Sequence, residues 1–126
     1  MVPDLRMPIV DVKDVARMHM QSIKVTATAG ERILSVSETK SFMEIAKLLK
    51  SKYPQSKVKT ALAPNLLIKF LSLLDPALMS VVAMLGKPQI ISHAKAERLL
   101  GMSFIPAQVS ILESADYLYK NGLIKR

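Results

Sequence analysis

A 20-residue apolar segment, "LLIKFLSLLDPALMSVVAML" at 66–85, is the feature that most restricts how this chain can fold. A run of this length is long enough to cross a bilayer as one helix. Lys69, Asp75 and Pro76 interrupt it, and Asp-Pro is typical of a helix stop followed by a restart, because proline is tolerated in the first turn of a new helix. The segment therefore predicts two short helices that are buried in protein, end at Gly86 and do not span a membrane.

The composition is that of an ordinary globular domain rather than a disordered chain. Of the 126 residues, 50% are apolar and 22% are charged. There is no cysteine, which excludes a disulfide framework, thiolate metal sites and a cysteine nucleophile, and which fits a reducing cytoplasm. Asp4 and Arg6 interrupt the opening residues, so no signal peptide is predicted there, and we expect a cytoplasmic location. Met79 and Met84 are interpreted as core filler.

The net charge of +8 leaves nucleic acid, an anionic membrane surface or a phosphorylated ligand open as partners. The lysines are scattered, however, and form no dense run. Aromatic residues, which would stack on bases, make up only 5% of the chain. We therefore predict a solvated basic surface and no nucleic-acid partner, and keep nucleic-acid binding as the weakest alternative.

Local signals in the first third predict a strand, a helix and a second strand. The β-branched residues at 9–12 favour a short strand, and Asp14 is predicted to cap a helix over roughly 15–24. Gly30 marks a turn. The alternation in "ERILSVS" at 31–37 predicts the second strand.

The rest of the chain is predicted to be mostly helical. Ser41 and Glu44 form a capping box, and Pro54 ends the helix that the box begins. Further expectations are an extended stretch at 57–62, a strand at 89–91, a helix that Ser92 caps and Gly101 ends, and a last helix at about 107–120 closed by Gly122. The fold class that follows is α/β, mostly helical with a few short strands.

No catalytic or metal site emerges from the polar residues. His19 has no second ligand one turn away, so we expect a packed, hydrogen-bonded side chain; His93 is distant in sequence. Asp11 and Asp14 resemble paired carboxylates, but no third group orients them for acid–base work. Asp14 is therefore interpreted as a cap and Asp11 as a local hydrogen-bonding group. Serines are plentiful, but none lies in a nucleophile motif.

The sequence also lacks the motifs of a dinucleotide-dependent reaction. A pyrophosphate needs a tight glycine-rich turn at a helix N-terminus, whereas the four glycines of this chain are scattered. "YPQSK" at 53–57 matches a Tyr-x-x-x-Lys pattern formally. Pro54 breaks any helix there, so Tyr53 and Lys57 would not share the one-turn geometry with which a lysine lowers a tyrosine pKa. We interpret the match as coincidence.

Three landmarks in colinear order nevertheless resemble a known family. They are "IVDVKDVARMH" at 9–19, "GERILSVSETKSFMEIAKLLKSKYP" at 30–54 and "ISHAKAERLLGMSFIPAQVSILESADYLYKNGLI" at 91–124. Together they are similar to the C-terminal part of extended short-chain dehydrogenases/reductases of the NAD-dependent epimerase/dehydratase family, and above all to its dihydroflavonol-reductase-like members. That family shows a "VDVRDVA..H" element, a "GERY" strand, a "SKARRELG" helix and a terminal "GL". Residues 61–88 match least.

The resemblance implies a C-terminal fragment of a Rossmann-type reductase of aldehydes or ketones. Residues 1–126 would form one substrate-side portion that lacks the dinucleotide-binding half. Residues 9–37 would pack on the absent Rossmann sheet, and 41–126 would form a helical cap. The parent would use NADP or NAD, whereas this chain alone would bind neither and would be inactive. The parent's substrate would be a small carbonyl compound.

The same resemblance places Met7 and Pro8 in a substrate-lining stretch. Proline cannot supply the side-chain hydrogen bond that some relatives place at this position, so these two residues would form an apolar wall; a simple lead-in loop is the equal alternative. Losing the Rossmann half would expose apolar surface and a sheet edge, which tend to pair with another chain. The expected partner is that half or a second copy. The alternative function is a non-catalytic, self-associating binding or assembly module derived from the fold.

Overall fold

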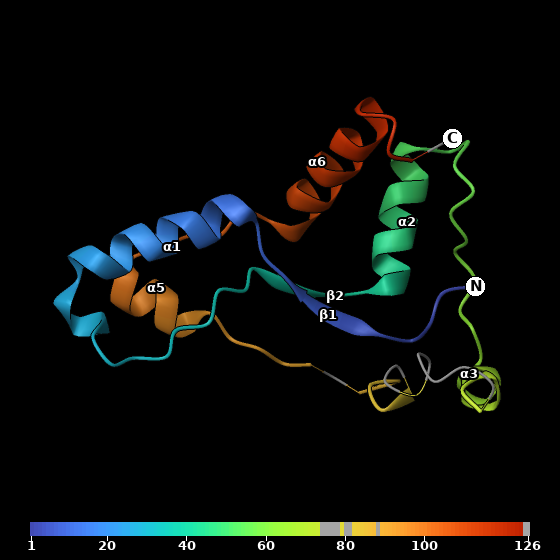
Figure 1. Cartoon of the computed structure of the whole chain (residues 1–126), viewed down its shortest axis with the longest axis horizontal. Coiled ribbons are helices and arrows are strands. Elements are labelled where there is room, and N and C mark those ends of the chain that lie inside the picture. Colours follow the sequence, from blue (N-terminus) through green and yellow to red (C-terminus); the bar gives the residue numbers. More distant parts are fainter. Residues whose placement is uncertain (74–78, 80–81, 88, 125–126) are drawn as a thin grey trace.

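The structure, a computed structural model, describes residues 1–73, 79, 82–87 and 89–124. It consists of helices around one two-stranded sheet, in agreement with the mostly helical α/β class (Figure 1). The elements are β1 (Arg6–Ile9), α1 (Val12–Lys24), a 3₁₀ turn η1 (Thr26–Thr28), β2 (Glu38–Ser41), α2 (Phe42–Lys52), α3 (Asn65–Leu71), α5 (Ala94–Leu100) and α6 (Ala107–Lys120).

The helices form two contacting pairs at opposite ends of the sheet. α1 packs against α5, and α2 packs against α6. The β1–β2 ribbon runs between the two pairs. α3 lies beyond the end of the ribbon that is nearer α2 (Figure 1). Segments far apart in the sequence therefore meet twice, once near α1 and once at the C-terminal ends of α2 and α6.

The two strands pair antiparallel, with Met7 opposite Lys40 and Pro8 opposite Thr39. The predicted strand at 31–37 is wrong, because residues 31–36 form no strand and the pairing falls on the polar residues Glu38–Ser41. The predicted strand at 9–12 likewise lies earlier, at Arg6–Ile9. Long-range pairing between the two segments decides both positions, and local alternation cannot show it.

The start of α1 reverses the roles expected for two aspartates. Asp11 is the N-cap: its backbone is extended, with ψ at 138°, and its carboxylate accepts from the Lys13 N–H at 2.9 Å. The prediction of Asp14 as the cap is wrong, since Asp14 lies in the first helical turn and is completely buried. The helix therefore begins three residues earlier than expected, at Val12 rather than 15.

The predicted capping box of α2 is confirmed. The Ser41 hydroxyl accepts from the Glu44 N–H at 3.1 Å, and the Glu44 carboxylate accepts from the Ser41 N–H at 2.7 Å. The helix ends at Lys52, with Tyr53 as its C-cap directly before Pro54. Both ends of α2 thus follow from local chemistry.

The central apolar segment is only partly buried. α3 is the first of the two helices predicted there, while the Asp75–Pro76 break lies outside the described residues. Ile68 packs with Ala63 and Leu85 in a small buried cluster. The opposite side of α3 is open, with Leu66 79% and Phe70 65% exposed.

Several smaller predictions in this region also failed. Met79 and Met84 are exposed and do not fill the core. Residues 89–91 form no strand. The extended stretch expected at 57–62 is not contradicted, because its residues belong to no helix and Leu62 makes a parallel bridge to Val2.

The last two helices have the expected ends. Gly101 closes α5 with a left-handed φ of 60°, and α6 covers the predicted 107–120. The Ser92 hydroxyl accepts from the Ala94 N–H at 3.2 Å, although His93 is the N-cap residue of α5. Among the described residues, no helix has the length and apolarity needed to cross a membrane.

Candidate functional site

The two residues predicted to contact substrate lie on strand β1. Met7 is 42% exposed and Pro8 is half-buried. As neighbours on a strand, their side chains project to opposite faces of the ribbon. Neither lines the pocket that lies between the C-terminal halves of α2 and α6. A role in substrate contact remains a prediction.

The two aspartates of the α1 turn form a buried network that ties α1 to the start of α6. One Asp11 oxygen accepts from the Ser110 hydroxyl at 2.7 Å, and one Asp14 oxygen accepts from the Ile105 N–H at 2.7 Å. Arg17 donates to the other Asp14 oxygen and, at 2.7 Å, to the Ser103 carbonyl. The remaining Asp11 oxygen accepts from the Lys13 N–H.

All four carboxylate oxygens therefore already accept a hydrogen bond. The Ser110 hydroxyl and then the Lys13 N–H hold the pKa of Asp11 below its usual value, because both bonds favour the ionised form. The start of strand β2 and the residue before it support the same junction. Glu38 accepts from the Ala107 N–H at 3.2 Å, and Ser37 donates to the Ile105 carbonyl at 2.6 Å. These hydrogen bonds give both carboxylates a structural role at the junction of α1 and α6.

Neither histidine has the surroundings of a metal ligand or a catalytic base. His19 is exposed, and its Nδ1 bonds to the Val15 carbonyl at 2.8 Å, so the predicted hydrogen bond is confirmed and the predicted packing is wrong. The His93 ring lies 5.1 Å from the Phe104 ring, and its Nε2 lies 3.3 Å from a Glu97 oxygen. Over the described part of the chain, no three His, Asp or Glu side chains gather as a metal site would require.

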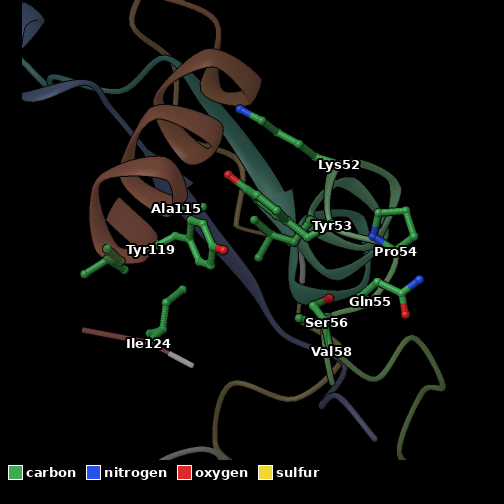
Figure 2. Close-up of a pocket in the computed structure, with 11 residues that line it drawn as sticks. Lys52, Tyr53, Pro54, Gln55, Ser56, Val58, Ala115, Tyr119 and Ile124 are labelled. Carbon is green, nitrogen blue, oxygen red and sulfur yellow. The ribbon is translucent and has the colours of Figure 1, made fainter. Parts of the chain in front are cut away.

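A pocket of about 370 Å³ lies between the C-terminal halves of α2 and α6 (Figure 2). The turn after α2 and the residues after α6 complete its walls. The rings of Tyr53 and Tyr119, whose centroids are 6.3 Å apart at an interplanar angle of 38°, line it together. Its apolar side chains come from both helices and both following segments, namely Leu49, Val58, Ala115, Leu118 and Ile124.

A polar triad closes one side of this pocket. The Asp116 carboxylate accepts from the Tyr53 hydroxyl on one oxygen and from the Lys52 ammonium, at 2.5 Å, on the other. The hydrogen bond from Lys52, followed by that from Tyr53, lowers the pKa of Asp116. In return, the bond to Asp116 raises the pKa values of Lys52 and of Tyr53.

The surroundings of Tyr53 differ from those of the catalytic tyrosine in a Tyr-x-x-x-Lys pair. Its hydroxyl bonds to Asp116 and not to Lys57, which is exposed. A general base needs a pKa lowered toward neutral pH, whereas Asp116 moves the pKa of Tyr53 upward. These observations support the interpretation of "YPQSK" as coincidence.

Sequence reasoning missed the pocket. Its walls come from residues about sixty positions apart in the chain, and apolar residues at helical spacing look the same whether they fill a core or line a cavity. The one usable signal was the neighbouring pair Lys52–Tyr53 at the end of α2, which combines an aromatic ring and a cation where the helix stops.

Tyr53 is expected to ionise above the usual tyrosine pKa of about 10. Replacing Asp116 with asparagine removes the negative charge that opposes ionisation, so the pKa should fall back toward that value. Subtracting the ultraviolet titration of a Tyr53→Phe variant from that of the parent isolates the signal. Because the folded pKa is raised, the stabilisation from this bond is complete below about pH 10 and is lost as pH rises through the folded value. Ionisation of Tyr53 below pH 10 would contradict the geometry.

Comparison with known proteins places the fold. No protein-family model matches the sequence, and no curated protein is a significant match. Solved structures do match, however. The gox2253 structure superposes with a TM-score of 0.75 at 18% identity and covers 96% of this chain. Gre2 from Candida albicans in complex with NADPH gives 0.66 at 22% identity and 95% coverage. The yeast methylglyoxal/isovaleraldehyde reductase Gre2, also complexed with NADPH, gives 0.62 at 20% identity and 95% coverage.

The chain therefore has the fold of one part of these larger proteins, two of which are structures with bound NADPH. It spans 39% of gox2253, 32% of the Candida protein and 35% of the yeast reductase. The shared fold is that of a portion of Gre2-type reductase structures, and the likeness extends over nearly the whole chain.

Proposed function

We propose that this chain is the C-terminal, substrate-side portion of an NAD(P)H-dependent reductase of aldehydes or ketones. The observation that carries the proposal is the asymmetry of the structural match. About 95% of this chain superposes on Gre2 structures described with NADPH, yet it accounts for only about a third of their length. The three colinear motifs support the same assignment, and they support the C-terminal position within the parent.

The residues of this chain do not fit a dinucleotide by themselves. A pyrophosphate binds at a helix N-terminus, where backbone N–H groups and the positive end of the dipole meet it. Gly101 and Gly122 instead follow the C-terminal ends of α5 and α6, and Gly30 and Gly86 close turns. We therefore assign cofactor binding and the hydride-transfer machinery to the remainder of the parent protein and derive no reaction step from this chain.

An exposed apolar stripe on α1 supports the proposal that residues 9–37 pack on a missing sheet. Val12, Ala16, Met20 and Ile23 recur at helical spacing, so they share one side of the helix. All four are exposed, with Val12 at 77% and Ile23 at 82%. A helix that carries such a stripe normally buries it against another layer. In this proposal residues 41–126 form the cap, and Met7 and Pro8 contribute an apolar wall to the substrate site.

Two expression products test the proposal, namely this chain and the product extended by the in-frame coding sequence upstream of Met1. We expect the extended protein to oxidise NADPH or NADH in the presence of aliphatic or aromatic aldehydes, followed at 340 nm, and to melt several degrees higher with the cofactor. This chain should do neither. Turnover or a clear rise in melting temperature with this chain alone would overturn the proposal, as would an upstream sequence that encodes no nucleotide-binding half.

A second candidate function is a non-catalytic, self-associating module. The observation that favours it is the open side of α3, where Leu66 and Phe70 face solvent and Leu73 continues the exposed surface. Apolar surface of this kind marks an interaction site more often than a solvated helix face. A second copy of the chain would cover it.

A further inference from the structure

We propose that the pocket between α2 and α6 binds a small amphipathic carboxylate, with its apolar body against the two tyrosine rings and its carboxylate at the lysines on the rim. The proposal does not depend on the reductase assignment. It uses the residues that line the pocket and the charges beside them, none of which belongs to β1, the α1 stripe or the α1–α6 network.

The interior of the pocket fits an apolar body of limited size. Its volume of about 370 Å³ lies at the lower end of the range for small-molecule sites. Tyr53 and Tyr119 are tilted against each other at the mouth, and Ala115 leaves room where a larger side chain would fill the space. Most of the remaining wall is aliphatic, with Gln55 and Ser56 as polar exceptions beside Lys52, so a chain or ring of a few carbons would bury most of its surface.

The charges at the rim favour an anion. Among the described residues, Lys50, Lys52 and Lys120 bring three ammonium groups to the ends of the two helices, where Asp116 supplies one carboxylate. The C-terminal ends of α2 and α6 oppose an anion with roughly half a negative charge each. Three ammonium groups and one carboxylate give a net charge of +2. The two helix dipoles together offset about one unit of it, so about one positive charge remains.

Polar donors at the rim retain capacity for a carboxylate. Lys52 donates to Asp116, and Lys50 donates to the Ser56 carbonyl at 2.6 Å, but each ammonium carries three protons. The Ser56 hydroxyl oxygen is buried beside the pocket and has no hydrogen-bond partner among the described residues. A ligand oxygen would reach this hydroxyl only after the Ser56 side chain turns toward the pocket, so the lysines supply the donors of the site as it stands. A cation or a purely apolar ligand would use none of these donors.

Titration of the ¹⁵N-labelled chain with octanoate tests the site, followed by two-dimensional NMR. Octanol supplies the same body without the charge, and octylammonium supplies the opposite charge. We expect saturable shifts centred on Tyr53, Ser56, Ala115 and Tyr119, with octanoate bound about tenfold more tightly than either control. Equal affinity for the three probes would overturn the carboxylate assignment. Shifts confined to α3, or shifts that do not saturate, would overturn the site.

Variants distinguish binding of octanoate in the pocket from nonspecific binding to apolar surface elsewhere. Ala115→Phe fills the cavity and should reduce octanoate affinity at least about tenfold. Ile124→Asp places a negative charge in the wall next to the chain end, where it disturbs the fold least, and should have the same effect. Leu66→Ser, on the exposed side of α3, is the matched control and should leave octanoate affinity unchanged. Retained binding in Ala115→Phe and Ile124→Asp, or lost binding in Leu66→Ser, would contradict the proposal.

Discussion

Replacing Asp14 with alanine is expected to lower the free energy of unfolding by about 3 kcal/mol, because it removes a buried carboxylate that accepts hydrogen bonds from two donors. The side chain is fully buried, and it accepts from the Ile105 N–H and from Arg17. Alanine would leave the Ile105 N–H and the Arg17 guanidinium without the carboxylate that accepts from both. Urea unfolding followed by far-ultraviolet circular dichroism measures the loss.

A matched control lies on the same two helices. Lys13 and Glu113 also link α1 to α6, at 2.7 Å, but both side chains are more than half exposed. Glu113→Ala should therefore leave stability unchanged within error, since solvent screens such pairs. Asp14→Asn keeps an oxygen for the Ile105 N–H and loses only the charge, so it should fall between the two. A loss below about 1 kcal/mol in Asp14→Ala would show that the junction is not fixed by this carboxylate.

Elements with strong local chemistry were predictable from the sequence. The Ser41–Glu44 box, the stop before Pro54 and the left-handed Gly101 each depend on residues within one turn of one another. In every case a side chain or a φ restriction satisfies backbone groups that the helix leaves free. Such signals do not depend on distant parts of the chain, so the sequence alone predicts these helix ends.

Elements decided by distant partners were not predictable in the same way. Asp11 and Asp14 both suit the start of a helix, and only the positions of Ser110 and Ile105, about a hundred residues away, assign one to the cap and the other to the interior. Likewise, "ERILSVS" has the better strand pattern, yet the ladder falls on Glu38–Ser41 because β1 pairs there. Tertiary pairing overrode local propensity in both places.

The largest discrepancy between sequence and structure concerns burial. The apolar pattern correctly placed α3 and α1, but it could not show that the chain itself covers only one side of each. The stripe on α1 and the open side of α3 are exposed although their composition is that of a core. The proposal that this chain is one portion of a larger protein would account for the exposure, because the apolar surface would then face the rest of that protein.

Serine at both Leu66 and Phe70 is expected to abolish concentration-dependent association of this chain. Both side chains project into solvent from α3 beside a shallow apolar depression that Pro64, Leu67 and Leu73 also line. Each would contribute about 2 kcal/mol when a second copy covers it, so losing both should weaken association at least about a hundredfold. Sedimentation velocity over a concentration series measures the change.

The α1 stripe supplies the comparison that separates the two candidate functions. Serine at Met20 and Ile23 removes a similar apolar area from the other exposed helix. If α3 is the self-association surface, this variant should associate like the parent chain. The same α1 change should nevertheless destabilise the extended reductase, where the stripe is proposed to be buried. Dissociation caused by the α1 variant and not by the α3 variant would show that two copies meet through the α1 stripe. A chain that is monomeric at every concentration would exclude the assembly module.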